Sequence, residues 1–245
     1  MTRVVVLAGG SPHAHDFAAI GDALGDLLAG HGIEVERFDH PDRAAARLDE
    51  GDVDALVVDG LWWQMLADVY EPWRSHAYST PVQTRTSLAG FVADGGGLVA
   101  LHTTPICFDD WPEWGDVVGG SWQWGVSSHP PLGPVMATIV AVHSVTAGLP
   151  DVVTLTDEVY GDMAVRGEVE ILATARRTPD DADQPVLWTH RYGRGRVVFD
   201  GFGHDPESIE NEDHARLIVQ AVDWVTSGVG SAAHASTNRV IGEQR

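Results

Sequence analysis

Apolar and polar positions follow two different rhythms along the first part of the chain. The run RVVVLA at Arg3–Ala8 is rich in β-branched residues and ends at two glycines, which is typical of a buried parallel strand entering a tight turn. The apolar positions that follow recur at helical spacing: Phe17, Ile20, Leu24, Leu27 and Leu28. Asp16 is placed to cap this predicted helix at its start, and Gly30 and Gly32 are placed to end it.

Strand-like and helix-like segments continue to alternate up to residue 102. The predicted strands are Ile33–Phe38, Asp54–Gly60 and Leu98–His102, and the predicted helices are Arg43–Glu50 and Val82–Asp94. This alternation favours an α/β fold with a doubly wound, mostly parallel sheet of the flavodoxin-like type. In such folds the ligand-binding residues gather at the carboxyl edge of the sheet.

After Val135 the pattern changes to strand-like segments with few helical residues between them. These segments are VMATIVAVH, VTLTDEVYG, VEILATA and PVLWTHRYGRGRVVFDGFGH. The sequence YGRGR is typical of a hairpin turn, which would join Trp188–Tyr192 to Val197–Asp200. We therefore expect an antiparallel extension of the sheet in the C-terminal half. An amphipathic helix at His214–Thr226 would close a single domain over residues 1–226, followed by a flexible tail over residues 227–245.

Two long connections, Leu61–Thr80 and Thr103–Pro134, hold seven of the nine tryptophans. Connections of this length inside a domain are usually functional. Indole rings suit the C–H faces of sugars, and they also fill gaps between loops and a sheet. The candidates for a substrate-binding wall are Trp111, Trp114, Trp124 and Tyr160. Packing in the core is the alternative for each of them.

Composition and charge exclude several functions. The chain has 245 residues, a formal net charge of −21 and 15 cationic residues, all of them arginine. Without lysine there is no Schiff-base chemistry and no P-loop phosphate lysine. Because the chain is this acidic, it should repel nucleic acids and anionic membranes. We therefore expect a neutral small molecule as partner. No segment resembles a signal peptide or a membrane span, and we expect a cytoplasmic protein, with a homo-oligomer as one possible state.

The stretch from Gly95 to Gly120 resembles the strand and turn that present a nucleophile in α/β enzymes. His102 stands where the nucleophile is expected, and Cys107, the only cysteine, lies beyond Pro105. We therefore expect Cys107 to pack in a loop or in the core rather than to attack a substrate.

Polar residues from separate segments should meet at the carboxyl edge of the predicted sheet. They are His13, His15, Asp16, His102, His129, Asp157, Glu158, Tyr160, His204 and Asp205. In one interpretation His102, His129, Glu158 and His204 perform general acid/base catalysis. In the other, His13, His15 and His102 hold a divalent metal such as zinc. His190 shares a strand face with Trp188 and Tyr192, and we expect it to be structural.

Several motifs occur in an order that resembles one family. They are GGSPHAHD, GGGLVALHTT, GGSWQWGVSSHP, DEVY and GRGRVVFDGFGH, spread over residues 3–226. Together they resemble the ThuA-like family, named for trehalose utilisation. The resemblance implies a fold like that of the class I glutamine amidotransferases, without the catalytic cysteine. It also implies carbohydrate metabolism, with a disaccharide, a glycoside or a keto derivative as substrate and an oxidoreductase as pathway partner.

Three functions therefore remain to be compared. The first is an enzyme that processes a sugar by histidine and carboxylate chemistry, with or without a metal. The second is a non-catalytic sugar-binding or regulatory module on a degenerate amidotransferase scaffold. The third, a working cysteine-dependent amidotransferase, is disfavoured because His102 occupies the turn.

Overall fold

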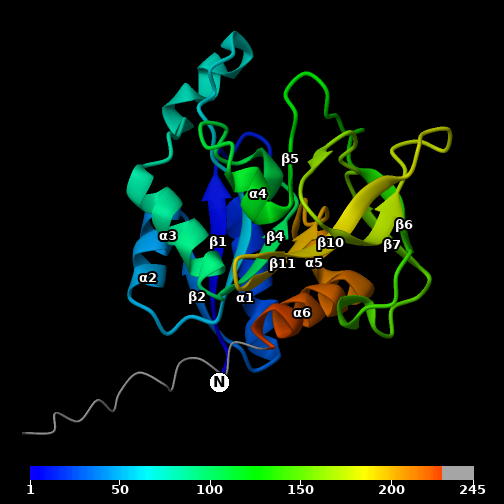
Figure 1. The fold of residues 1–245 in the computed structure, drawn as a ribbon. Coiled ribbons are helices and arrows are strands. Elements are labelled where there is room, and N and C mark those ends of the chain that lie inside the picture. Colours follow the sequence, from blue (N-terminus) through cyan, green and yellow to red (C-terminus); the bar gives the residue numbers. More distant parts are fainter. Residues whose placement is uncertain (228–245) are drawn as a thin grey trace, which may run out of the picture.

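A nine-stranded mixed sheet runs through the part of the chain that the structure describes, residues 1–227 (Figure 1). This computed structural model orders the strands β2-β1-β3-β4-β11-β10-β9-β6-β7. The predicted tail lies outside the described residues, apart from Ser227.

The first five strands in this order are parallel to one another. They are β2 (Glu34–Phe38), β1 (Arg3–Gly10), β3 (Ala55–Leu61), β4 (Gly97–Leu101) and β11 (Gly195–Asp200). The other four continue the sheet in antiparallel pairs. They are β10 (Gln184–Tyr192), β9 (Glu170–Ala175), β6 (Gly133–Ile139) and β7 (Val152–Asp157). The structure thus confirms the predicted α/β fold with a parallel core and an antiparallel extension.

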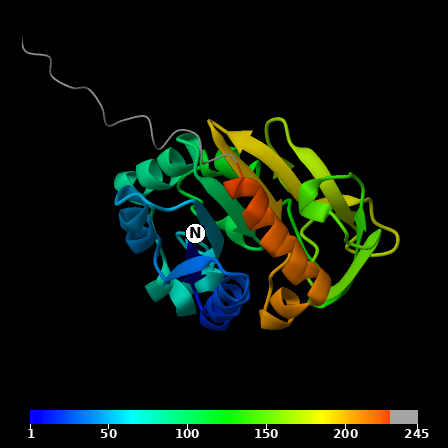
Figure 2. The ribbon, with the colours of Figure 1, turned by 90° about the horizontal axis from the view of Figure 1, so that it is seen from below.

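Helices cover both faces of the parallel core, because both faces of its strands are apolar. Val4 and Val6 pack toward α1 (Phe17–Gly30) and α6 (Glu212–Thr226), whereas Val5 and Leu7 belong to the core on the other face. That second face is covered by α2 (Pro41–Asp49), α3 (Val82–Ala93) and α4 (Trp114–Val118). Figure 2 shows α1 and α6 on the opposite side of the sheet from α3.

Local sequence signals set several boundaries where they were predicted. Asp16 caps α1 by accepting a hydrogen bond from the backbone of Ala19 at 3.1 Å. The YGRGR segment forms the turn between β10 and β11. Helix α6 begins two residues earlier than predicted, because Asn211 caps the backbone of Asp213 and His214.

The remaining elements are short and lie in the connections. They are the 3₁₀ helices η1 (Asp68–His76), η2 (Thr104–Ile106) and η3 (Ser144–Thr146), the helix α5 (Pro206–Glu210) and the two-stranded pair β5 (Gly120–Ser121) and β8 (Ala164–Val165). Figure 1 shows η1 projecting above the carboxyl edge of the parallel strands.

The antiparallel half of the sheet curls back toward the parallel half. In a flat sheet, β7 would lie four strand spacings, roughly 19 Å, from β11. Yet Oδ2 of Asp157, at the end of β7, accepts a hydrogen bond at 2.9 Å from the backbone N–H of Gly203, just after β11. This curl brings the end of β7 to the same place as the ends of β1, β4 and β11.

Candidate functional site

Histidines from three strand ends meet at the carboxyl edge of the sheet. His15 follows β1, His102 follows β4 and His204 follows β11. One possible ligand atom from each of these residues lies within 4.8 Å of the other two. We call these three residues the histidine cluster. No other group of three metal-ligating side chains this close together is found within residues 1–227.

The turn after β4 holds His102 in an unusual backbone conformation. Its φ angle is +40°, in the left-handed region that non-glycine residues rarely adopt. Such a conformation costs of order 1–3 kcal/mol and persists only where the surroundings impose it. Here the backbone N–H of His102 donates to the backbone carbonyl of Asp200 at 2.8 Å, and the His102 side chain is fully buried. The strained turn is therefore present, with an imidazole at its apex.

Backbone carbonyls determine which nitrogen of the two deepest imidazoles carries the proton. Nδ1 of His102 lies 3.1 Å from the carbonyl of Gly201, and Nδ1 of His15 lies 3.1 Å from the carbonyl of His204. Because a carbonyl only accepts, both Nδ1 atoms are the donors, and the lone pair of each neutral ring is on Nε2. Histidines that bind metals are commonly held by this kind of outer hydrogen bond.

Both of these rings are neutral at pH 7. Burial lowers the pKa of His15 to about 4, with a further contribution from His102 beside it. Burial likewise lowers the pKa of His102 to about 4, although the nearby Glu158 carboxylate opposes the shift. A neutral imidazole is the form that ligates metals or accepts protons.

Glu158, which follows β7, links the histidine cluster to the surface. Its Oε2 lies 3.1 Å from Nδ1 of His129 and 3.7 Å from both Nδ1 of His204 and Nε2 of His102. Burial opposes ionisation of this carboxyl, but the attraction of the nearby His129 and His204 imidazoles outweighs it and holds the pKa of Glu158 well below the usual range. The pKa values of His129 and His204 are raised in return. The four predicted catalytic residues thus lie in one group.

Tyr160 also belongs to this group, because its hydroxyl contacts His102. Its hydroxyl lies 3.2 Å from Nε2 of His102, and burial raises the pKa of the phenol well above its ordinary value. The protonated hydroxyl therefore donates to His102. The Tyr160 ring packs 4.8 Å from the His102 ring, 5.2 Å from Trp122 and 5.3 Å from His129.

Two buried carboxyl groups, those of Asp157 and Asp59, lie next to the site. Asp157 accepts hydrogen bonds from the backbone of Gly203 and Glu158 and from the hydroxyl of Ser208. Asp59 was not among the predicted residues, although its position in the apolar run ALVVDGL is unusual for an acid. Burial raises its pKa well above the ordinary value, and within the described part of the chain its Oδ2 has no hydrogen-bond partner.

His13 does not join the predicted metal set; His204 takes its place. Residues 12–14 form a turn, so His13 and His15 do not point in the same direction as they would on a strand. Nδ1 of His13 lies 2.7 Å from the hydroxyl of Ser11, and its ring stacks on Trp73 at 4.7 Å. Sequence spacing favoured the HAH pair, whereas the curled sheet brings in a residue 189 positions away.

Two of the predicted wall tryptophans belong to the core instead. Trp111 and Trp114 are 6% and 2% exposed and pack against Phe108 on the α4 side of the sheet. Trp124 is 51% exposed and lies above the carboxyl edge, 6.4 Å from Tyr70 of η1. The aromatic residues near this edge that the sequence did not single out are Trp63, Tyr70, Trp73 and Trp122. Tryptophan content alone could not separate core rings from edge rings.

Cys107 lies at the end of η2 and away from the apex of the turn. It is 4% exposed, and its Sγ lies 2.7 Å from the carbonyl of Gly60. Burial raises the pKa of this thiol, so the nucleophilic thiolate does not form near neutral pH. His190 donates from Nε2 to the carbonyl of Val117, as a structural residue does.

Comparison with known proteins identifies related sequences and folds. A model of the ThuA family, described as trehalose utilisation, matches residues 3–225. Among curated proteins, none matches the chain significantly. No helix within residues 1–227 is both long and apolar enough to cross a membrane.

Solved structures share the fold at low sequence identity. A ThuA-like protein from Parabacteroides merdae has a TM-score of 0.75 and 20% identity, over 93% of this chain and 90% of that one. A ThuA-like protein from Bacteroides uniformis has a TM-score of 0.66 and 18% identity, over 91% of each chain. A glutamine amidotransferase from Thermotoga maritima has a TM-score of 0.56 and 11% identity, over 93% of this chain and 98% of that one.

Proposed function

Because this chain belongs to the ThuA (trehalose utilisation) family, we propose that it is an enzyme that processes a disaccharide, a glycoside or a keto derivative of one. In this proposal the histidine cluster of His15, His102 and His204 holds a divalent metal such as zinc, and Glu158 and His129 move protons. The proposal joins the two interpretations of the sequence, since the metal ligands and the acid/base residues lie side by side.

The observation that carries the proposal is the orientation of the imidazoles. Carbonyls of Gly201 and His204 fix the Nδ1–H groups of His102 and His15, which leaves the lone pair of each neutral ring on Nε2. In His102 this atom accepts the hydroxyl of Tyr160 at 3.2 Å, a hydrogen bond that a bound metal would replace. Three histidines with one open position are a common ligand set for catalytic zinc. Carboxylate and imidazole together also suit neighbouring divalent metals.

The groups around the cluster fit proton transfer. A metal in the cluster would act as a Lewis acid toward a hydroxyl or carbonyl oxygen of the sugar. Glu158 is ionised and can accept a proton, and His129, hydrogen-bonded to it, can return one to a leaving oxygen. The His129 side chain is 39% exposed, whereas Glu158 is 8% exposed, so a substrate would approach from the His129 side.

Elemental analysis of untagged protein tests the metal. We expect one equivalent of a divalent metal in the wild type and little in His102→Ala and His204→Ala. His13→Ala is the matched control, because His13 lies outside the cluster, and it should keep its metal. Equal metal content in all four proteins would overturn the metal site.

Turnover of trehalose and of its keto derivative, followed by NMR, tests the catalysis. Glu158→Gln removes the carboxylate but keeps the shape, so it should bind the sugar and lose activity by about 100-fold or more. Wild-type binding without turnover would support the second candidate, a sugar-binding or regulatory module. The nearly complete burial of His15 and His102 favours that candidate, because buried imidazoles are poorly accessible to a substrate.

A location in the cytoplasm and a pathway partner are part of the proposal. The acidic chain and the lack of a membrane-crossing helix in its described part support a cytoplasmic location. A keto sugar substrate would be supplied by an oxidoreductase that oxidises a sugar hydroxyl, which is the partner that we infer.

A further inference from the structure

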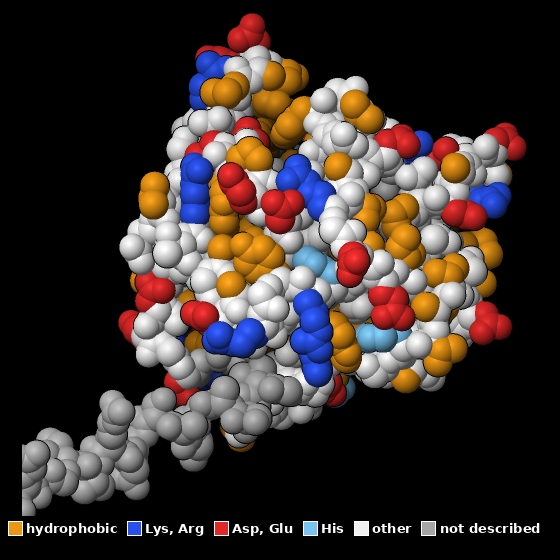
Figure 3. Space-filling view, in the orientation of Figure 1, with side chains coloured by type: hydrophobic (Ala, Val, Ile, Leu, Met, Phe, Trp, Pro, Cys, Tyr) orange, Lys and Arg blue, Asp and Glu red, His pale blue; other side chains and the backbone are white. Residues whose placement is uncertain are grey.

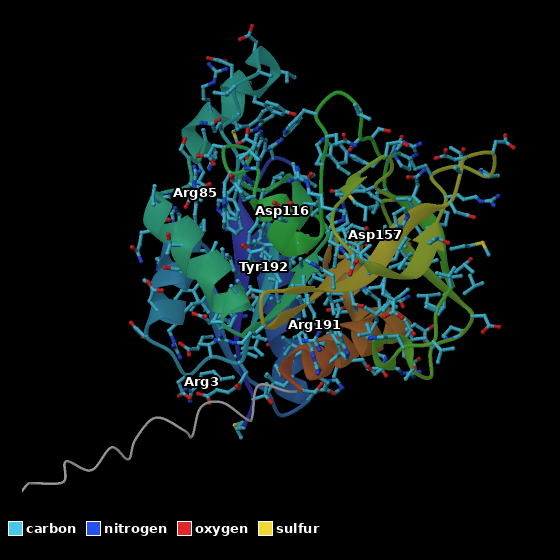
Figure 4. All side chains as sticks on the ribbon, viewed as in Figure 1. Arg3, Arg85, Asp116, Asp157, Arg191 and Tyr192 are labelled. Carbon is cyan, nitrogen blue, oxygen red and sulfur yellow. The ribbon has the colours of Figure 1, made fainter. Side chains whose placement is uncertain are left out.

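A pocket lies at the opposite edge of the sheet from the histidine cluster. Its volume is about 720 Å³, which is within the range for small-molecule sites. It lies between the ends of α2 and α3 and the hairpin that joins β10 to β11. Figure 4 labels Arg191 and Tyr192 on this hairpin.

Three arginines of the hairpin line this pocket: Arg191, Arg194 and Arg196. Arg191 and Arg196 are directly opposite each other in the antiparallel register, so their side chains leave the sheet on the same face. Like charges in that arrangement destabilise a sheet. Figure 3 shows arginine side chains at the lower middle of the drawn face of the molecule and others in its upper half.

The chain does not neutralise the Arg191–Arg196 pair, although acidic residues are abundant. It has 36 acidic residues and 15 arginines. Arg194 pairs with Asp94, and most other arginines of the described region also have a carboxylate within 4.0 Å. Within residues 1–227 the exceptions are Arg74, Arg191 and Arg196. Two of these three are the cross-strand neighbours in this pocket.

The remaining polar groups of the pocket do not compensate this charge. Arg196 donates to the carbonyl of Trp224 at 2.9 Å and to the hydroxyl of Ser227 at 2.7 Å, and neither acceptor is charged. The carboxylate of Asp49 accepts hydrogen bonds from Ser87 and Gln83 instead of pairing with an arginine of this pocket. Arg191 also borders a groove lined by Glu168 and Glu170, but neither carboxylate lies within 4.0 Å of its guanidinium.

The rest of the lining combines apolar and polar side chains. The apolar ones are Leu48, Val53, Phe91 and Val225, and the polar ones include Gln83, Thr86 and Ser87. The Phe91 ring covers Gly96, where a Cβ would lie 2.4 Å from the ring. A ligand for the whole pocket therefore needs an anionic group at one end and an apolar ring at the other.

We propose that this pocket binds a phosphate ester of a ring-bearing small molecule, of the size of a nucleoside monophosphate, as a second site separate from the histidine cluster. The phosphate lies between Arg191 and Arg196, and the ring packs against Phe91 and Val53. A phosphate dianion fits two arginines because each guanidinium can donate two parallel hydrogen bonds. This site does not depend on the function proposed for the other edge.

Calorimetric titration of the full chain with AMP, adenosine and inorganic phosphate tests the proposal. We expect AMP to bind, and to bind at least about tenfold more tightly than inorganic phosphate or adenosine, since each fills half of the pocket. Arg191→Gln should weaken AMP binding by about tenfold or more, as expected for a lost charge-assisted hydrogen bond. Higher salt should weaken it too.

Arg74→Gln is the matched control, because Arg74 is also without a carboxylate partner but lies in η1 at the other edge. It should leave AMP binding unchanged. Absence of AMP binding, or equal loss in both variants, would overturn the site. A denaturant unfolding curve of Arg191→Gln that matches the wild-type curve would show that the variant is folded.

Discussion

Gly203 donates its backbone N–H to Asp157 while its Cα hydrogen faces the side chain of Asp59. The Asp157 contact is 2.9 Å, and a Cβ at position 203 would lie 2.9 Å from Oδ2 of Asp59. The φ angle of Gly203 is +125°, which L-residues rarely adopt. This glycine therefore connects β7 to the segment that carries His204.

Gly203→Ala should destabilise the protein and weaken metal binding. The cost of the strained backbone alone is of order 1–3 kcal/mol, and the contact with Asp59 adds to it and shifts His204. Denaturant unfolding and metal titration measure the two effects. Gly148→Ala is the control, because Gly148 also has a positive φ angle, +72°, but no atom lies within 4 Å of its Cβ position. Equal losses in both variants would contradict the role of crowding at Gly203.

Trp114→Ala should lower the stability of the protein strongly, whereas Trp124→Ala should hardly change it. Trp114 is 2% exposed and donates from Nε1 to the carbonyl of Thr104, so its removal should cost about 3–5 kcal/mol. Trp124 is 51% exposed, so its removal should change stability by less than about 0.5 kcal/mol. Thermal or denaturant unfolding checks both values. If Trp124→Ala alone weakens trehalose binding, Trp124 is part of the substrate wall.

The buried pair of His214 and Asp200 should make stability depend on pH. Burial lowers the pKa of His214, but Asp200, with Oδ2 3.0 Å from Nε2, outweighs it and raises the pKa above 6.5. The charged pair stabilises the fold fully below the pKa of unfolded histidine. That contribution is lost as the pH rises through the raised pKa of the folded state.

We therefore expect the free energy of unfolding to fall between pH 6.5 and the pKa of folded His214. Urea unfolding over this range measures the slope. His214→Gln keeps the size and one hydrogen bond. Its stability should be lower at pH 6 and should fall less steeply over the same range, because only His129 and His204, whose pKa values are also raised, still contribute. An unchanged slope in His214→Gln would assign the whole effect to these other groups.

Cys107 should react with thiol reagents only after unfolding. The thiol is buried beside the carbonyl of Gly60, and burial raises its pKa. A chromogenic disulfide reagent should therefore label no thiol in the native protein and one in denaturant. Cys107→Ala should keep any sugar-processing activity. Rapid native labelling with loss of activity would revive a cysteine-dependent mechanism.

Local patterns predicted the elements because they depend on a few neighbouring residues. The apolar runs at β1, β3 and β4, the Asp16 cap and the YGRGR turn each specify their own structure. The carboxyl-edge position of His102 also followed from the strand pattern. In a parallel sheet, the end of a strand determines where its next residue lies.

Long-range geometry decided the rest. The curl of the antiparallel half places Glu158 beside His204, and strand order alone does not specify that contact. The turn at residues 12–14 removes His13 from the site, which a period-two pattern could not show. The burial of Trp111 and Trp114 depends on α4 packing against β10. These two elements are far apart in the sequence, and no motif indicates that they meet.

The position of β11 has a consequence for synthesis on the ribosome. This strand pairs with β4 although Val197 and its partner Leu98 are 99 residues apart in the chain. Until residues 195–200 leave the exit tunnel, β4 is an edge strand whose backbone N–H and C=O groups on that side have no strand partner. The carbonyl that orients His102 arrives only with Gly201. Nascent chains that stop before residue 200 should therefore depend on chaperones and have no formed site.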